Sequence, residues 1–156
     1  EEAEWAIESG IFDTLQTTFS LLDQGARYGL FEQAKAQGVG IIGKRPIANA
    51  LWGKAAAGEP GDYPGVGVLL YERAKTMQEM GALEGAPDDH IELALGFVLA
   101  HPEVHTAIVG TRNPAHMLSN VETVEKRLPI SKDVVAELHR RHDQVGRDWP
   151  GIDVVR

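Results

Sequence analysis

One stretch, residues 108–120, brings together the residue types that hold a phosphate group. Two apolar residues lead into a turn, and Asn113 followed by Pro114 is typical of a helix start, because Asn caps the first turn and Pro needs no backbone donor there. A helix start presents unpaired N–H groups and the positive end of its dipole, which favour an anion. The other residues that would line such a site are Gly110, Thr111, Arg112 and His116. The stretch predicts a phosphate site, although an ordinary strand–helix turn with a solvated arginine fits it equally well.

A second pattern, Gly38–Gly43, matches the letters G-x-G-x-x-G. A dinucleotide fingerprint of this kind lies between a strand and the helix that follows it. Here the pattern follows a predicted helix and is itself the predicted strand. We therefore interpret it as a helix end followed by close packing.

The remaining chemistry-bearing residues do not form a reaction centre by spacing. His139 and His142 could share a helix face, but a third metal ligand is not spaced nearby, so no metal site is predicted. Asp88 and Asp89 precede a predicted helix and are expected to cap it. The three tyrosines lack a spacing that indicates a proton donor, and no catalytic residue is assigned.

Alternating strands and helices would position these residues, which indicates an α/β fold with parallel strands. Short apolar runs predict strands at 13–18, 39–43 and 106–109. Helical spacing and caps predict helices at 1–9, 24–37, 66–80, 87–100 and 114–126, and a last one that begins after Ser131. Residues 46–64 are rich in Gly and Pro and are expected to form a loop.

Composition narrows the class of protein. The chain has 156 residues, 43% of them hydrophobic, which is typical of a globular domain. A net charge of −8 argues against a nucleic-acid or anionic-membrane surface. The absence of Cys fits a cytoplasmic protein. The longest apolar stretch, 91–100, is too short to cross a bilayer.

Three segments, in this order, resemble the aldo-keto reductases, a superfamily of (β/α)8 barrels that use a nicotinamide cofactor. Leu15–Asp23 is similar to the sixth strand of that barrel and Gly40–Asn49 to the seventh. Val109–Pro114, with Asn120 beyond it, resembles the last strand–helix unit. Since a whole barrel needs roughly 250 residues, the resemblance implies one incomplete domain over 1–156. The implied fold is a partial (half) TIM-type barrel, about the last three βα units plus a C-terminal helix.

The resemblance also implies NADP as cofactor and assigns its contacts. Gln16 would bond the nicotinamide amide, although as a barrel-interior residue it could instead pair with backbone. The turn and helix start would hold the 2′-phosphate and adenine through Gly110, Thr111, Arg112, Asn113, His116 and Asn120. The seventh strand and its loop would follow the pyrophosphate through Lys44, Arg45, Pro46, Ile47, Asn49 and Lys54. The alternative for Lys44 and Arg45 is two solvated cations. The family often has Arg where this chain has His116, and an aromatic residue where it has Lys44.

The family's catalytic Asp, Tyr, Lys and His lie in the first half of the barrel, before any segment matched here. The first hypothesis is therefore the cofactor-binding C-terminal portion of an NADP-dependent oxidoreductase acting on a small carbonyl substrate, inactive alone. The second is a non-catalytic half-barrel that binds nucleotide or a partner chain. Open sheet edges would in either case favour a homo-oligomer or pairing with an N-terminal half.

Overall fold

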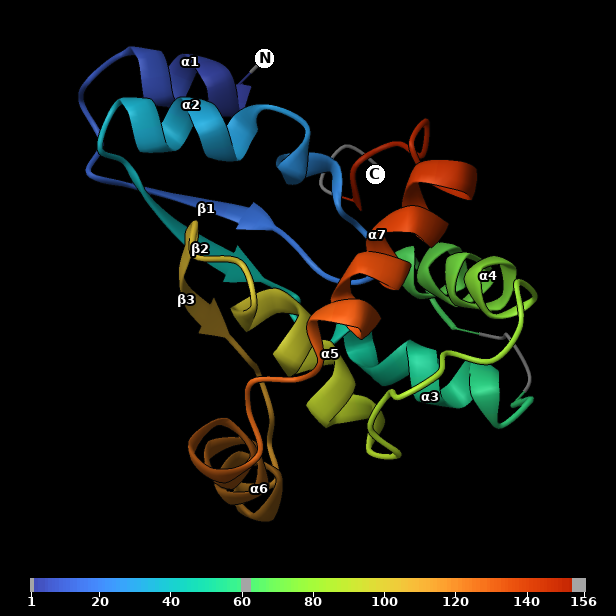
Figure 1. Cartoon of the computed structure of the whole chain (residues 1–156). Helices are drawn as coiled ribbons and strands as arrows, with labels where there is room; N and C mark the ends of the chain where they lie inside the picture. Colours follow the sequence, from blue (N-terminus) through green and yellow to red (C-terminus); the bar gives the residue numbers. More distant parts are fainter. Residues whose placement is uncertain (1, 60–62, 153–156) are drawn as a thin grey trace.

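A computed structural model describes residues 2–59 and 63–152 and shows the alternation of strands and helices that the sequence predicts (Figure 1). The first part of the chain contains α1 (Glu2–Glu8), β1 (Thr14–Thr18), η1 (Gly25–Arg27), α2 (Leu30–Ala36), β2 (Gly40–Lys44) and η2 (Ala48–Ala50). The second part contains α3 (Leu51–Ala56), α4 (Val66–Gln78), α5 (His90–Leu99), β3 (Val104–Ile108), α6 (Pro114–Lys126) and α7 (Lys132–Val145).

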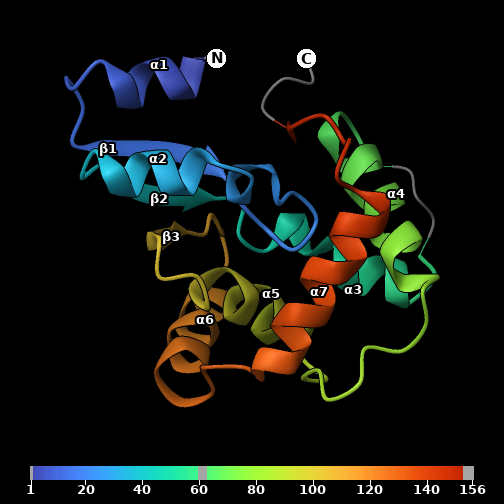
Figure 2. The ribbon, with the colours of Figure 1, turned by 45° about the horizontal axis from the view of Figure 1, so that its top comes forward.

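Within the described residues, the strands form one parallel sheet in the order β1-β2-β3. β1 and β2 pair in register from Thr14 opposite Gly40 to Thr18 opposite Lys44. The pairing of β2 with β3 shifts register between Ile41 and Ile42. Because the strands are parallel, their carboxyl ends meet at one edge, and in both ribbon views α3, α4 and α7 lie beyond that edge (Figures 1 and 2).

One face of the sheet is buried beneath α2 and α5. The ring of Phe19, just after β1, lies 4.8 Å from that of Phe31 in α2 and 5.7 Å from that of Phe97 in α5. At Gly43 of β2 an added Cβ would lie 3.7 Å from Cγ1 of Val98, so the helix approaches the strand closely. The apolar circumference of α5 predicts this burial, which the structure confirms.

The glycines of the G-x-G-x-x-G pattern serve the packing that we inferred from sequence. Gly38 has a φ of +69° and ends α2, with its N–H donating to the carbonyl of Lys35. Gly40 and Gly43 both belong to β2. The pattern therefore spans a helix end and a strand, and it is not a strand-to-helix phosphate loop.

The opposite face of the sheet is left uncovered. Gln16, Ile42 and Thr106 are aligned across the three strands, and the outer two are exposed. In a closed barrel this face would look inward. None of the helices in the described ranges is both long and apolar enough to cross a membrane.

Two local expectations were wrong. The helix expected over 24–37 begins only at Leu30, because Gly29 with a φ of +109° interrupts it and the preceding turn is the 3-10 helix η1. The loop expected over 46–64 instead contains η2 and the short helix α3. The strand expected at 106–109 runs from Val104 to Ile108.

Candidate functional site

The carboxyl ends of the three strands place the candidate residues at one edge of the sheet. Lys44, the last residue of β2, is aligned with Thr18 of β1 on one side and Ile108 of β3 on the other. The loops that follow β2 and β3 therefore start side by side. Ligands of parallel α/β barrels gather at this edge.

The turn after β3 leads directly into α6, as predicted. The side-chain oxygen of Asn113 accepts a hydrogen bond from the N–H of Ala115 (3.0 Å), which confirms Asn113 as the N-cap, with Pro114 at the first helical position. The carbonyl of Asn113 accepts from the N–H of His116 (3.1 Å). The N–H of Asn113 itself donates to Oγ1 of Thr111 (3.1 Å). The expectation that this first helical turn presents unpaired N–H groups is therefore wrong, because the cap and the turn satisfy them.

The free backbone donors lie one step earlier in the chain. The N–H groups of Gly110, Thr111 and Arg112 donate to no acceptor within residues 2–59 and 63–152. Successive backbone N–H groups in a turn form a concavity that suits an anion. The donor set predicted for the helix start therefore lies in the turn that precedes it.

Two of these donors, Gly110 and Thr111, border a cavity of about 360 Å³ between the loop after β2, the start of α5 and the start of α6. Five of the residues predicted from sequence line it: Ile47, Gly110, Thr111, His116 and Asn120. The other lining residues were not predicted as site residues from sequence: Ala50, Asp89, Ile91, Val109 and Ser119. Of these, Asp89 is the single charged group, and it reaches the cavity because it caps α5, accepting from the N–H groups of Ile91 (2.8 Å) and Glu92 (3.3 Å).

Two residues of the turn have no structural task of their own. Gly110 does not have a positive φ, and a Cβ added there would meet nothing within 4 Å. Arg112 is exposed and makes no hydrogen bond or ion pair with the residues that the structure describes. A glycine that the fold does not require, beside an arginine without a partner, is what a phosphate ligand would use.

The loop after β2 has an unusual backbone. Arg45, Ala48, Asn49 and Ala50 all have positive φ values, between 46° and 59°. Each left-handed residue other than Gly costs about 1 kcal/mol or more, and such residues cluster at functional sites. Nη1 of Arg45 lies 3.4 Å from Oγ1 of Thr18, which links this loop to the end of β1. The predicted residues Lys44 and Pro46 flank this arginine, half-buried and buried respectively.

Eight predicted residues lie outside the cavity lining: Lys44, Arg45, Pro46, Arg112 and Asn113, described above, and Gln16, Asn49 and Lys54. Gln16 is exposed on the uncovered face of the sheet. Asn49 is exposed in the left-handed turn. Lys54 lies on α3 with Nζ 4.8 Å from the centre of the Tyr63 ring.

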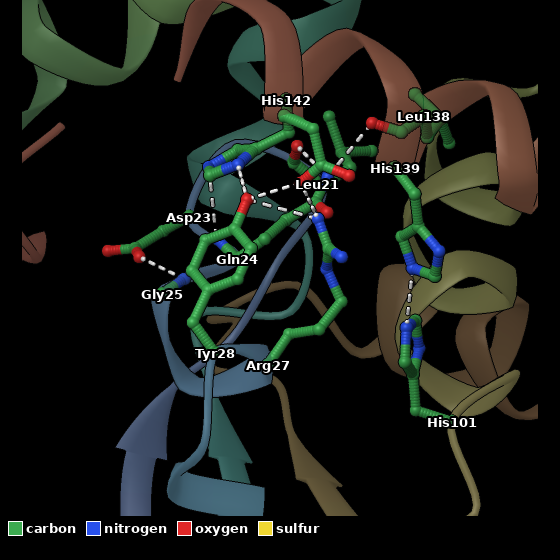
Figure 3. Close-up of polar contacts among 11 residues, drawn as sticks. Leu21, Asp23, Gln24, Gly25, Arg27, Tyr28, His101, Leu138, His139 and His142 are labelled. Carbon is green, nitrogen blue, oxygen red and sulfur yellow. Dashed lines mark hydrogen bonds and ion pairs between the residues drawn. The ribbon is translucent and has the colours of Figure 1, made fainter. Parts of the chain in front are cut away.

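A separate polar network lies between η1, α5 and α7 (Figure 3). Tyr28 donates to Oδ1 of Asp143 (2.6 Å), and desolvation together with this hydrogen bond raises the pKa of Tyr28 to about 12. A phenol with so high a pKa is a weak acid near pH 7, and its O–H already donates to Asp143. Among the described residues, no three His, Cys, Asp or Glu side chains are grouped so that they could hold a metal ion.

Comparisons with known proteins identify the family and the fold. Residues 2–141 match the sequence model of the Aldo/keto reductase family. The holo form of the aldo-keto reductase AKR11C1 from Bacillus halodurans is similar in structure, with a TM-score of 0.66 and 24% identity over 88% of this chain and 45% of the reductase. Its apo form gives a TM-score of 0.67 and 23% identity over 88% and 46%. The chain thus spans about half the length of these structures. No curated protein sequence matches it.

Proposed function

The chain belongs to the Aldo/keto reductase family, and we propose that it forms the portion of an NADP-dependent member that binds the phosphate end of the cofactor. Its fold is a partial TIM-type barrel. The family generally uses nicotinamide cofactors. We propose the preference for NADP and the contact residues. We also propose that the rest of a barrel supplies the catalytic groups.

The turn 110–112 carries the proposal, because its donor chemistry fits a phosphate. Within the described residues, the N–H groups of Gly110 and Thr111 have no acceptor, and both residues border one cavity, with open space at Gly110. Arg112, whose side chain has no partner in the same part of the chain, follows them directly. A guanidinium and neighbouring amides are the groups that bind phosphate most strongly in proteins. In this assignment Thr111 adds a hydroxyl, and Asn113 holds the helix start in place.

The remaining predicted residues would extend the site from this anchor. His116, one helical turn into α6, would contact the 2′-phosphate, and Asn120 the adenine. Lys44, Arg45, Pro46, Ile47, Asn49 and Lys54 would follow the pyrophosphate, and Gln16 would bond the nicotinamide amide. The linked ends of β1 and β2 support this path, since Arg45 bonds to Thr18 there.

When bound, the nicotinamide would supply a hydride to a small carbonyl compound. The residues of this chain would bind and orient the cofactor, and the groups that donate the proton would belong to polypeptide outside 1–156. We therefore expect the chain by itself to bind NADP(H) without reducing carbonyls at enzymatic rates. We also propose a cytoplasmic location, where this cofactor is available.

Titration with NADPH and with NADH, followed by calorimetry, tests the proposal. We expect tighter binding of NADPH, and Arg112→Ala should weaken it by roughly 10- to 100-fold through the loss of a charge-assisted hydrogen bond. The matched control is Lys126→Ala, an exposed cation at the other end of α6 that should leave the affinity unchanged. An unchanged affinity for NADPH in Arg112→Ala would refute the assignment.

The uncovered edges of the sheet favour a partner polypeptide. An apolar groove of about 620 Å³ runs between β3 and α6, and four of its apolar lining residues are exposed: Ile108, Met117, Val121 and Val124. Near β1, at the opposite edge of the sheet, three large apolar side chains are exposed: Trp5 of α1, and Ile11 and Phe12 between α1 and β1. We propose that both surfaces are covered by an N-terminal half of the barrel, or by a second copy when that half is absent. Light scattering of the isolated chain, with and without an N-terminal half, distinguishes these partners, and a stable monomer under both conditions would contradict the proposal.

A further inference from the structure

Helix α7 is attached to the rest of the molecule through histidines, of which His101 and His142 are buried and His139 is half-buried (Figure 3). Nε2 of His139 on α7 lies 2.9 Å from Nε2 of His101, which comes directly after Ala100, the C-cap of α5. His142, one turn further along α7, contacts the segment after β1. His101, His139 and His142 are called the α7 histidine network below.

The first contact requires a defined arrangement of protons. Nδ1 of His101 lies 2.8 Å from the carbonyl oxygen of Phe97, and because a carbonyl only accepts, this nitrogen carries a proton. In neutral His101, Nε2 is then an acceptor, so His139 donates from its own Nε2. One added proton can be placed on Nδ1 of His139 while the bridge persists. A second added proton would have to go on Nε2 of His101, where its N–H would face the N–H of His139.

The second contact tolerates no added proton. Nε2 of His142 lies 3.3 Å from the backbone nitrogen of Gln24, and because an amide N–H only donates, this ring nitrogen must be an acceptor. Its Nδ1–H donates to the oxygen of Tyr28 (3.0 Å), and Tyr28 donates onward to Asp143. Protonation at Nε2 would turn the first of these hydrogen bonds into a repulsion between two donors.

The charged groups around the network are mainly cationic. Arg27 of η1 contributes positive charge at all three histidines, and Arg73 of α4 does so at His142. Arg147, beyond α7, lies over the Tyr28 ring. The opposing carboxylates are Asp143 on α7, which is already paired with Arg27, and Glu103 near His101. An added imidazolium charge would therefore be buried beside arginines.

We propose that the α7 histidine network is an acid-sensitive attachment, which holds α7 in place while its imidazoles are neutral and releases it when they are protonated. The segment after α7 would be released with it, up to Ile152, whose N–H donates to Oδ2 of Asp23 in the same loop after β1 (2.8 Å). The device lies in the fold and does not depend on the cofactor assignment.

The pKa values agree in sign with this geometry. Burial, followed by the charge of Arg27, lowers the pKa of both His139 and His142 from 6.5 to about 4, and burial also lowers the pKa of His101. A histidine whose pKa is lowered on folding stabilises the protein fully above pH 6.5 and loses that contribution as the pH falls toward 4. As the pH falls from 6.5 to 4.5, protonation of His139 and of His142 should each raise the equilibrium constant for unfolding by roughly 40-fold.

Urea unfolding at pH 6.5 and pH 4.5 tests the proposal on the protein as isolated. His142→Gln and His139→Gln should each remove roughly 40-fold from the pH-dependent rise of the unfolding constant. The matched control is His116→Gln, because the exposed imidazole of His116 makes no hydrogen bond in the described part of the chain, and this variant should keep the whole rise. A rise that is unchanged in both test variants would overturn the proposal.

Two measurements on the unsubstituted protein keep the test decisive if a variant does not fold. NMR titration of the ring protons should show His139 and His142 titrating below pH 5, and titration of either near 6.5 would contradict the network. Amide protection should fall in α7 before it falls in β2 as the pH is lowered. Simultaneous loss in both elements would show that α7 is not released separately.

Discussion

The side-chain oxygen of Asn113 lies 3.0 Å from the backbone nitrogen of Ala115, and this hydrogen bond fixes the start of α6 against the turn that carries Arg112. Asn113→Ala should cost about 1 kcal/mol of stability, while Asn113→Asp or Asn113→Ser should cost little, because both keep an N-cap acceptor. Urea unfolding measures the difference. Equal losses for Ala and Ser would show that the cap is not the cause.

Two glycines should respond to the same substitution in opposite ways. A Cβ at Gly96, in the buried part of α5, would lie 2.4 Å from Cγ2 of Ile130, whereas at Gly110 it would meet nothing. Gly96→Ala should therefore destabilise by roughly 1–3 kcal/mol through overpacking, despite the better helix propensity of Ala. Gly110→Ala should leave the free energy of unfolding within about 0.5 kcal/mol and weaken only NADPH binding. Thermal unfolding and calorimetry together check the pair, and a stable Gly96→Ala would contradict the packing.

Local chemistry explains why parts of the fold were predictable. The dipeptide Asn113-Pro114 specifies a helix start through a side-chain acceptor and a fixed φ, and α6 begins there. The continuous apolar run 39–43 predicted a central parallel strand, because such runs are typical of strands covered on both faces, and β2 does lie between two strands. Helices bury one of its faces, and its other face would look inward in a closed barrel. Both signals lie within a few residues of the structure they produce.

The features that sequence reasoning missed depend on contacts between distant residues. Asp89 was predicted as a cap, but only the packing of α5 beside α6 brings it to the cavity. His101 meets His139, 38 positions away, with no spacing rule to reveal it. Ala48 and Ala50 have left-handed backbones, which Gly or Asn would have indicated and Ala does not. The position of Asp89, the contact of His101 with His139 and the backbone of Ala48 and Ala50 all depend on tertiary packing.

A buried ion pair ties the C-terminal segment to the loop after β1. Oδ2 of Asp23 lies 3.8 Å from Nη1 of Arg73 and accepts the N–H of Ile152 (2.8 Å). Removing one partner of a buried pair leaves an uncompensated charge, so Asp23→Ala should destabilise by roughly 3–5 kcal/mol. The exposed pair of Glu122 and Lys126 provides the control, since Glu122→Gln should cost less than about 0.5 kcal/mol. Similar costs in the two variants, measured by urea unfolding, would argue against the burial of this pair.

Glu137 should give a second acid-dependent step, below that of the histidines. Hydrogen bonds from Arg140 and Arg141 lower its pKa from 4.5 to about 2. A carboxylate whose pKa is lowered on folding stabilises fully above pH 4.5 and loses that contribution as the pH falls toward 2. Glu137→Gln should therefore reduce the loss of stability between pH 5 and pH 3, as measured by urea unfolding. The exposed Glu125, which has no partner among the described residues, provides the control, and an equal effect of Glu125→Gln would contradict the assignment.

The groove between β3 and α6 allows the proposed partner surface to be tested without disturbing the fold. Val121 lines the groove and is 46% exposed, whereas Leu118, on the same helix, is 71% exposed and lies outside the groove. Val121→Lys should leave the stability of the chain within about 0.5 kcal/mol, because Lys is solvated there and forms helix at least as well as Val. In a complex it would bury a charge against apolar side chains, so association with an N-terminal half, or with a second copy, should weaken at least about 10-fold. Leu118→Lys should leave association unchanged. Analytical ultracentrifugation checks both variants, and equal affinities for the two would show that this groove is not where the partner binds.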